Sequence, residues 1–315
     1  MSGKRKDRFE TVLNRFPASA QSLLRGLPRQ GGRLSQKTCR ELMRVLNVST
    51  EELMMRLLPL AKAFSLASVS HFHVGAVALA ETGPVAGQMD LYLGANMEFE
   101  HSALNMAVHA EQSAVTNAWH HGACRIQSIA VSELPCGHCR QFLQELYGSS
   151  DLMILKPAGE GDAYHAKRLP ELFPAGFSPS ALGNGEGFMA VPHTIRHLGL
   201  AHPSNDPVVQ AALSAAVASY APYTGNFAGC ALQTPGGEIV NGSYVESVAY
   251  NPSISPIHSA LLRLNLMTLE ETHAIDRIVL VEKPTRIRQK DLVEMLIRSW
   301  VQDVEFAYYI AQEEE

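Results

Sequence analysis

The sequence predicts an α/β fold in which one layered domain occurs twice behind a small helical unit. Three observations predict this class. Segments with helical and with strand-like apolar spacing alternate along the chain, short motifs recur in the same order in the second half, and the first 50 residues show helical spacing alone. With 315 residues, 46% of them hydrophobic, the chain has enough apolar surface for two cores.

Residues 1–50 are predicted to form the helical N-terminal unit. No group of reactive side chains accompanies its helically spaced apolar residues, which are Val12, Leu13, Phe16, Leu42, Val45 and Leu46. A basic cluster of Lys4, Arg5 and Lys6 stands near the start, and we expect it to be a solvated, frayed terminus.

Residues 51–156 are predicted to form the first layered domain. Ser49, followed three residues later by Glu52, has the pattern of a capping box and predicts a helix that runs toward Phe64. The later segments alternate between the two spacings. In order, they predict a β-hairpin from runs 74–79 and 91–93, a helix at 106–119, a strand at 126–131, a helix at 136–147 and a strand at 152–155.

Residues 157–205 are rich in Gly, Pro, Ala and His, which predicts a linker with some ordered pieces. Residues 206–315 then repeat the first domain. Three segments of the first domain have similar counterparts in the same order: residues 94–98 match 242–246, 109–111 match 258–260, and 129–136 match 278–285.

This alignment keeps a histidine, His258, in the second copy. It places Ala260, Thr285 and Arg288 where the first copy has Glu111, Cys136 and Cys139. The second copy thus lacks both thiols and the acid of the first. The second copy is therefore predicted to be degenerate and catalytically silent.

Cys136 and Cys139 are spaced as metal ligands, at a point where a predicted strand passes into a helix. The positive end of a helix favours the thiolate form, and three ligands from Cys and His leave a zinc ion one position for water. His109 supplies the third ligand. The Cys pair alone is also compatible with a redox dithiol or a structural zinc knuckle, and in the second case His138 is a possible fourth ligand.

Glu111 favours the catalytic alternative. Residues two apart diverge on a regular helix, so His109 and Glu111 approach one metal only at the first turn of the helix. A carboxylate placed there reaches a metal-activated water without binding the metal.

At this point the chain resembles a known family. His109-Ala110-Glu111 with Pro135-Cys136-Gly137-His138-Cys139 is similar to the signature of zinc deaminases. Four longer motifs resemble cytidine deaminases, and the whole arrangement resembles their two-domain dimeric bacterial type. The motifs are Phe72-x-Val74-Gly75-Ala76, Gly94-Ala95-Asn96-x-Glu98, His109-Ala110-Glu111-Gln112 and Pro135-Cys136-Gly137-x-Cys139-Arg140-Gln141.

The resemblance implies a three-layer α-β-α sandwich around a mixed sheet, present as an active and a degenerate copy. It also implies one Zn²⁺ per chain, a homodimer, and a role in pyrimidine salvage. Asn96 and Glu98 resemble the pair that binds the sugar hydroxyl, Phe72 the aromatic residue that packs on the pyrimidine, and the backbone near Ala110 and Leu134 the contact to the base edge. Phe173 or Phe177 would reach a neighbouring subunit's site, although an ordinary buried role is equally compatible.

The expected reaction is hydrolytic deamination of cytidine and deoxycytidine to uridine, deoxyuridine and ammonia. Hydroxide formed on the zinc attacks C4, and Glu111 shuttles the proton to N3 and to the departing amine. The rival hypotheses are a nucleic-acid deaminase, a free-nucleotide deaminase and a non-catalytic zinc-scaffolded binding protein.

Composition helps to distinguish between these hypotheses and predicts the cellular compartment. A net charge of -5 disfavours a nucleic-acid substrate, and no basic cluster flanks Asn96 or Glu98 to hold a phosphate. Five cysteines, an odd number, favour a reducing compartment; with no predicted signal or membrane segment we expect a cytoplasmic protein. Cys39, Cys124 and Cys230 are predicted to pack as small apolar residues.

Overall fold

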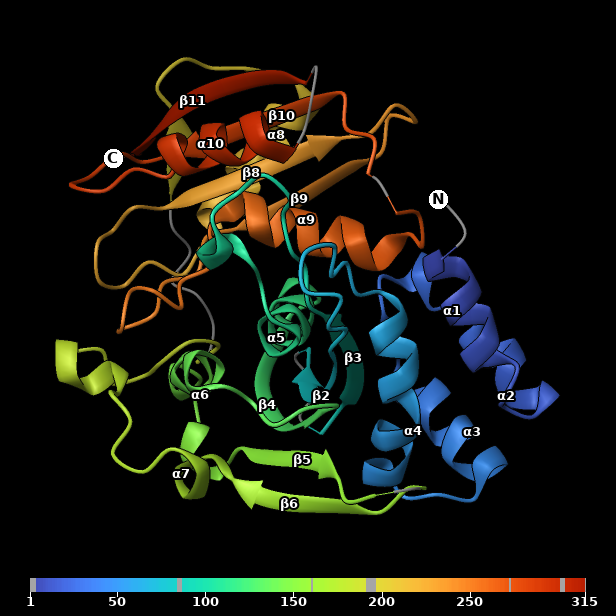
Figure 1. Ribbon diagram of the computed structural model, residues 1–315. Helices are drawn as coiled ribbons and strands as arrows, with labels where there is room; N and C mark the ends of the chain where they lie inside the picture. Colours follow the sequence, from blue (N-terminus) through green and yellow to red (C-terminus); the bar gives the residue numbers. More distant parts are fainter. Residues whose placement is uncertain are drawn as a thin grey trace.

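The computed structural model describes residues 4–83, 87–159, 161–190, 197–271, 273–300 and 304–314. Figure 1 shows two sheet-containing halves, one above the other, with helices α5 (Ala110–His120) and α9 (Pro256–Met267) facing each other between them. The N-terminal helices lie against the side of the first half. The duplicated α/β arrangement predicted from the sequence is confirmed.

Three helices make up most of the N-terminal unit: α1 (Lys4–Leu13), α2 (Ala18–Leu24) and α3 (Gln36–Leu46). A 3-10 turn at Pro28–Gln30 and the short strand β1 (Arg33–Leu34) connect α2 to α3. Ser35 caps α3 by accepting a hydrogen bond from the amide of Thr38.

The prediction of a solvated terminus is wrong for Arg5, whose exposed fraction is 0%. Its guanidinium donates to the carbonyl of Phe64 at 2.8 Å and to that of Asn265 at 3.1 Å. Its amide donates to the Glu271 carboxylate at 2.7 Å. Burial lowers the pKa of Arg5 to about 10, while the charges of Glu271 and Glu270 act in the opposite direction. The hydrogen bonds join α1 to both halves of the chain.

Helix α4 (Thr50–Ala63) begins as the capping-box pattern predicts. The Ser49 hydroxyl accepts from the amide of Glu52 at 3.2 Å, and the Glu52 carboxylate accepts from the amide of Ser49 at 2.7 Å. One face of α4 packs on the first sheet and the other on the N-terminal helices.

The first sheet has the strand order β1-β3-β2-β4-β5-β6. Strands β2 (Gly75–Thr82) and β3 (Met89–Ala95) form the expected antiparallel hairpin, whose connection includes residues 84–86, outside the described ranges. Strand β4 (Ala123–Val131) is antiparallel to β2 and parallel to β5 (Met153–Pro157), so the sheet is mixed.

Side chains alternate between the two faces of this sheet, which produces two cores. Val77, Leu93 and Ala130 face α4 and the N-terminal helices. Ala76, Ala78, Ile129 and Val131 face α5 and α6 (Gly137–Gln144). Helices therefore cover both faces, and the predicted three-layer α-β-α sandwich is confirmed.

The segment predicted as a linker contributes strands to both halves. Strand β6 (Tyr164–Arg168) pairs antiparallel with β5, and β7 (Leu198–Leu200) pairs with the C-terminal strand β11 (Glu305–Glu313). Between them lie α7 (Leu169–Leu172) and a 3-10 turn at Pro179–Leu182. Residues 160 and 191–196 of this segment are outside the described ranges.

The second sheet has the order β7-β11-β10-β8-β9. Strands β8 (Ala228–Gln233) and β9 (Ile239–Ser243) form a hairpin, and β10 (Arg277–Glu282) is antiparallel to β8 and parallel to β11. Helix α8 (Pro207–Val217) covers one face, and α9 and α10 (Lys290–Trp300) cover the other. This order of pairings repeats that of the first half.

The predicted equivalence of His258 with His109 is wrong by three residues. A Cβ on Gly94 would lie 2.2 Å from the amide nitrogen of Ala114, and one on Gly242 would lie 2.0 Å from that of Ala260. Ala114 is five residues after the N-cap His109, and Ala260 is five after the N-cap Ser255.

A second contact fixes the same register. Asn117 donates to the carbonyl of Leu93, the residue before Gly94, and Arg263 donates to the carbonyl of Asn241, the residue before Gly242. Ser255 and Ile257 therefore stand where the first half has His109 and Glu111, and His258 corresponds to Gln112. Among the described residues, the second half holds no group of His, Cys, Asp or Glu arranged as metal ligands.

A buried carboxylate joins the two halves. Glu145, which ends α6, accepts hydrogen bonds from the hydroxyl of Tyr220 at 2.7 Å, the hydroxyl of Tyr223, and the amide of Val248 at 2.8 Å. Burial raises the pKa of Glu145. The three donors belong to the second half and satisfy the charge of a residue from the first.

Candidate metal and substrate site

His109 is the N-cap of α5, and its amide donates to the side chain of Gln112 at 3.1 Å. The helix was expected from residue 106. Instead, Leu104–Met106 form a 3-10 turn, Val108 pairs with Met97, and α5 begins at Ala110. Because the cap residue has extended backbone, its side chain and that of Glu111 can both face the space in front of the helix.

Cys136 is the N-cap of α6, and Cys139 lies in the first turn. The strand β4 ends five residues earlier and delivers both sulfurs to the N-terminus of α5. The Nδ1 atom of His109 lies 3.4 Å from the Cys136 sulfur and 3.2 Å from the Cys139 sulfur. The three ligand atoms all lie within 4.8 Å of one another.

This donor set fits zinc. Tetrahedral bonds of about 2.3 Å to sulfur and 2.0 Å to nitrogen place the ligand atoms roughly 3.5 Å apart. Hydrogen bonds from the Cys139 thiol and the His109 ring lower the pKa of Cys136 to about 3, so this sulfur is a thiolate. The metal-binding group found among the described residues does not include His138. The His138 ring lies beside His109 instead, with the ring centres 5.5 Å apart.

The Glu111 carboxyl lies close to this group and is only 4% exposed. Burial raises its pKa, while the nearby His109 ring acts in the opposite direction. A carboxyl with a raised pKa exchanges protons more readily near neutral pH than an exposed one.

A cavity of about 220 Å³ opens in front of the metal group. The remaining residues predicted to contact substrate all line it: Phe72, Asn96, Glu98, Ala110 and Leu134. Phe72 is 57% exposed, so it is not a core residue in this chain. Phe173 packs partly against the core of the first half, Phe177 is exposed, and neither lines this cavity.

Asn96 is held on both sides of its amide. Its oxygen accepts from the hydroxyl of Ser65 at 2.6 Å and from the amide of Val74 at 2.8 Å, and its nitrogen donates to the carbonyl of Phe72 at 2.9 Å. Ser65 was not among the predicted site residues. Its partner lies 31 residues away, so no local pattern could have identified it.

Glu98 is also held by hydrogen bonds. Its carboxylate accepts from the amides of Val69 at 2.9 Å and Ser70 at 2.8 Å, and from the hydroxyl of Ser70. Ser70, another lining residue that the sequence analysis did not identify, also accepts from the amide of Phe72. The loop that carries Phe72 is thereby fixed to Glu98.

The other cysteines lie elsewhere. Cys39 and Cys230 are buried, Cys124 is half-buried, and all three are free thiols. Burial raises the pKa of each. No helix among the described residues is long and apolar enough to cross a membrane.

Two stretches of the chain match family models for the cytidine and deoxycytidylate deaminase zinc-binding region, one at residues 48–155 and the other at 169–294. The second match begins inside the segment predicted as a linker. Both halves are therefore related to the same family, although only the first carries the three metal ligands.

The chain is 38% identical to a cytidine deaminase of Vibrio vulnificus over 280 residues, which is 88% of this chain and 90% of that protein. It is 39% identical to one of Aliivibrio fischeri over 251 residues, 80% of this chain and 79% of that protein. A solved cytidine deaminase of Mycobacterium tuberculosis covers 38% of this chain and 89% of its own, with 30% identity and a TM-score of 0.30. With these matches in both halves and over most of its length, the chain belongs to the cytidine deaminase family.

Proposed function

We propose that the chain hydrolyses cytidine and deoxycytidine to uridine and deoxyuridine with release of ammonia, as an enzyme of pyrimidine salvage. One observation carries the proposal. A His, Cys, Cys group and a buried carboxyl lie together at one small cavity, whose walls also carry polar and aromatic groups suited to a nucleoside. The relatives named above, cytidine deaminases at 38–39% identity, support the same reaction.

His109, Cys136 and Cys139 would hold one zinc ion. When bound, the ion would supply a Lewis acid that lowers the pKa of a nearby water. Glu111 accepts one proton of the attacking water and passes it to N3 of the cytosine ring. It then accepts the proton of the new C4 hydroxyl and delivers it to the amine, which leaves as ammonia as the C4 carbonyl forms. Its burial keeps the proton within the site during these transfers.

The other lining residues position the nucleoside. The fixed side chains of Asn96 and Glu98 accept and donate at the sugar hydroxyl, while the exposed ring of Phe72 packs on the pyrimidine. The amide of Ala110, at the first position of α5, has no partner within the helix and faces the base edge. A cavity of about 220 Å³ is small compared with the roughly 300 Å³ or more of typical small-molecule sites, so it favours a single nucleoside over a larger substrate.

The division of labour in the chain is also part of this proposal. Residues 51–156 form the catalytic domain, 206–315 the degenerate domain, 1–50 the helical unit and 157–205 the linking segment. The assembly is a homodimer, and the enzyme is cytoplasmic. Three exposed apolar residues support the dimer. Phe72 and Leu134 line the site, and Val69 donates its amide to the lining residue Glu98.

The test is an ultraviolet absorbance assay on the zinc-loaded protein with cytidine, deoxycytidine, cytidine monophosphate and single-stranded DNA. We expect conversion of the two nucleosides and little of the others. An inert zinc-loaded protein would support the binding-protein alternative, and preferential conversion of the monophosphate or DNA would support one of the other deaminase classes.

A further inference from the structure

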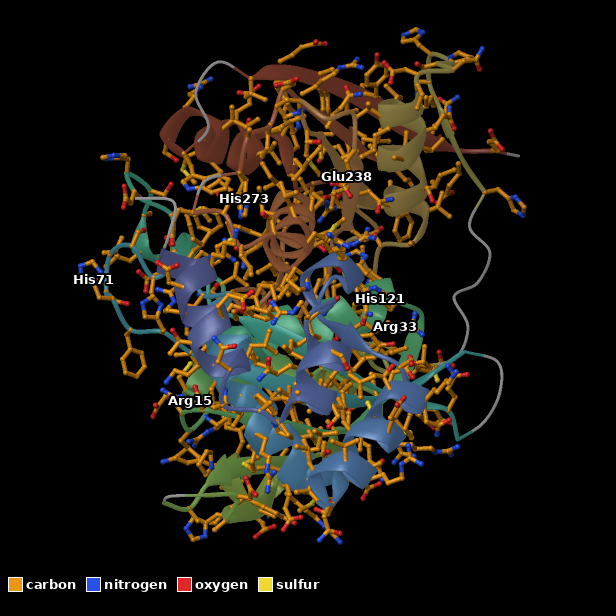
Figure 2. The ribbon with its side chains drawn as sticks, turned by 90° about the vertical axis from the view of Figure 1, so that its right-hand side faces the viewer. Arg15, Arg33, His71, His121, Glu238 and His273 are labelled. Carbon is orange, nitrogen blue, oxygen red and sulfur yellow. The ribbon has the colours of Figure 1, made fainter. Side chains whose placement is uncertain are left out.

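A second cavity, which we call the arginine cavity, lies at the opposite end of α5 from the metal group. Its volume is about 480 Å³. His109 and His121 cap the two ends of α5 and are 12 residues apart, which on a helix corresponds to about 18 Å. The arginine cavity is therefore separate from the nucleoside cavity, and Figure 2 shows Arg33 and His121 close together on its side of the molecule.

Three parts of the chain build this cavity. The N-terminal unit contributes the turn before β1 and the start of α3, the first half contributes the end of α5, and the second half contributes α9. The polar residues that concern us are Arg29, Arg33, Ser35, Thr38, His121 and Arg263. No acidic residue is among the lining residues.

Two of the three arginines have no acidic partner. Arg29 and Arg263 have no carboxylate within 4.0 Å in the described part of the chain. Arg263 is half-buried and donates to the backbone carbonyl of Asn241 at 2.7 Å and to the side-chain oxygen of the same residue, both of which are neutral acceptors. Burial lowers the pKa of Arg263. This excess of positive charge occurs in a chain whose net charge is -5.

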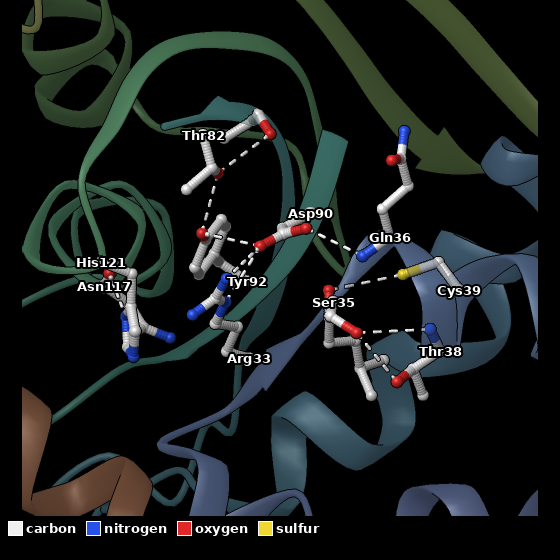
Figure 3. Close-up of polar contacts among 12 residues, drawn as sticks. Arg33, Ser35, Gln36, Thr38, Cys39, Thr82, Asp90, Tyr92, Asn117 and His121 are labelled. Carbon is white, nitrogen blue, oxygen red and sulfur yellow. Dashed lines mark hydrogen bonds and ion pairs between the residues drawn. The ribbon is translucent and has the colours of Figure 1, made fainter. Parts of the chain in front are cut away.

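Arg33 is held in place from behind. Its Nε and Nη2 atoms donate to Asp90 at 2.9 and 2.7 Å, and the buried Asp90 also accepts from the amide of Gln36 at 2.8 Å. Figure 3 shows this network, together with the hydroxyl of Tyr92 beside Asp90. Such a guanidinium is fixed before any ligand arrives, so little side-chain entropy is lost on binding.

Neutral donors complete the wall. The hydroxyls of Ser35 and Thr38 lie 3.0 Å apart at the N-terminus of α3. The Nδ1 atom of His121 lies 2.9 Å from the carbonyl of Asn117, which leaves Nε2 for another partner. Arginines and hydroxyls are among the groups with which proteins bind phosphate.

We propose that the arginine cavity binds a small phosphate-bearing anion. The two uncompensated guanidiniums account for a ligand with more than one negative charge, and the volume exceeds what a single phosphate group fills. Because the N-terminal unit, α5 and α9 all line the cavity, the bound anion connects three separate parts of the fold. Binding to the folded state alone stabilises that state.

The test is isothermal titration of the zinc-loaded full chain with inorganic pyrophosphate and, separately, with adenosine diphosphate, in phosphate-free buffer at constant ionic strength. We expect saturable binding of one anion per chain and a higher melting temperature at saturation. Equal affinity for the two probes would assign recognition to the phosphates alone. About tenfold tighter binding of adenosine diphosphate would assign recognition to a nucleotide, because both probes carry two phosphates.

Arg29→Gln and Arg263→Gln should each weaken binding about tenfold or more, as expected for loss of a charged donor. Arg25→Gln is the matched control. Arg25 lies on the same segment but pairs with Glu10 outside the cavity. The Arg25→Gln variant should therefore bind the probes with unchanged affinity. Arg29 is exposed, so its variant keeps the test valid even if Arg263→Gln folds poorly.

Absence of saturable binding by both probes would overturn the proposal, as would equal affinity in Arg29→Gln, Arg25→Gln and the unmodified protein. Cytidine turnover by the same samples is read independently. A protein that deaminates cytidine but binds neither probe contradicts only the arginine cavity, whereas one that binds pyrophosphate but is inert contradicts only the proposed function.

Discussion

Glu98 and Glu246 make the same hydrogen bonds to corresponding loops in the two halves of the chain. Glu98 accepts from the amides of Val69 and Ser70 and from the Ser70 hydroxyl. Glu246 accepts from the amides of Tyr223 and Thr224 and from the Thr224 hydroxyl. The loop contact therefore needs no substrate, and Glu98 differs from its counterpart in lining the nucleoside cavity.

Variants of Glu98 and Glu246 distinguish a role in holding the loop from a role in binding substrate. Glu98→Gln should raise KM for cytidine about tenfold or more, because a charged acceptor at the sugar is lost, while zinc content is unchanged. Glu246→Gln loses the same loop contact in the second half and should lower the melting temperature without changing KM. Steady-state kinetics and thermal unfolding of both variants check this. An equal change of KM in the two would show that the effect of Glu98 is structural only.

Glu111→Gln should lower kcat roughly 100- to 10,000-fold, because the amide cannot accept the proton of the attacking water. Zinc content should remain at one ion per chain, since Glu111 is not among the three ligands. The measurements are single-turnover kinetics and elemental analysis of the same preparation. A near-normal rate would contradict the proposed proton transfer.

Cys139→Ser should remove zinc and activity together, because the buried sulfur is one of three ligand atoms. Cys124→Ser is the control: its thiol is half-buried, lies near the carbonyl of Glu81, and should leave zinc and rate unchanged. Removing the metal from the unmodified protein with a chelator should abolish turnover, and adding zinc should restore it. Full activity in metal-free protein would exclude this site as the source of the reaction.

His258→Gln should make the protein less sensitive to acid. Burial lowers the pKa of His258 to about 4, against about 6.5 in an unfolded chain. Below about pH 6.5 the unfolded chain binds a proton at His258, whereas the folded chain does not. The free energy of unfolding therefore falls as the pH drops from about 6.5 to 4. The loss over this window is about 3 kcal/mol.

Glutamine suits position 258, because Gln112 occupies the corresponding place in the first half. The comparison is urea unfolding of both proteins at pH 7 and pH 5. Between pH 7 and pH 5, the free energy of unfolding should fall more in the unmodified protein than in His258→Gln. Parallel losses in the two proteins would show that His258 is not the group responsible.

The metal group could be predicted because most of its signal is local. Cys136 and Cys139 lie in one turn of helix, and His109 with Glu111 lie at the start of another. The position of His258 could not be predicted in the same way. The shared histidine favours one alignment, whereas the packing of Gly94 and Gly242 against the two helices requires another.

The burial of Arg5 and the arginine cavity could not be predicted, because both depend on partners far away in the sequence. Arg5 looks like part of a basic terminus, and the carbonyls that bury it belong to residues 59 and more positions away. The arginine cavity likewise combines Arg29 and Arg33 with Arg263, more than 200 residues later in the sequence. Neither arrangement leaves a periodic pattern in the sequence, because each depends on how the two halves dock.

The Glu145 contact sets a condition on any attempt to re-engineer the second half as an enzyme. The loop that corresponds to the one carrying Phe72 begins at Tyr223, and there the phenol is already committed to a carboxylate from the other half. Grafting a histidine, a glutamate and two cysteines into that half would therefore not suffice. A designer would first have to clear Glu145 from beneath the loop and supply new partners for Tyr220 and Val248.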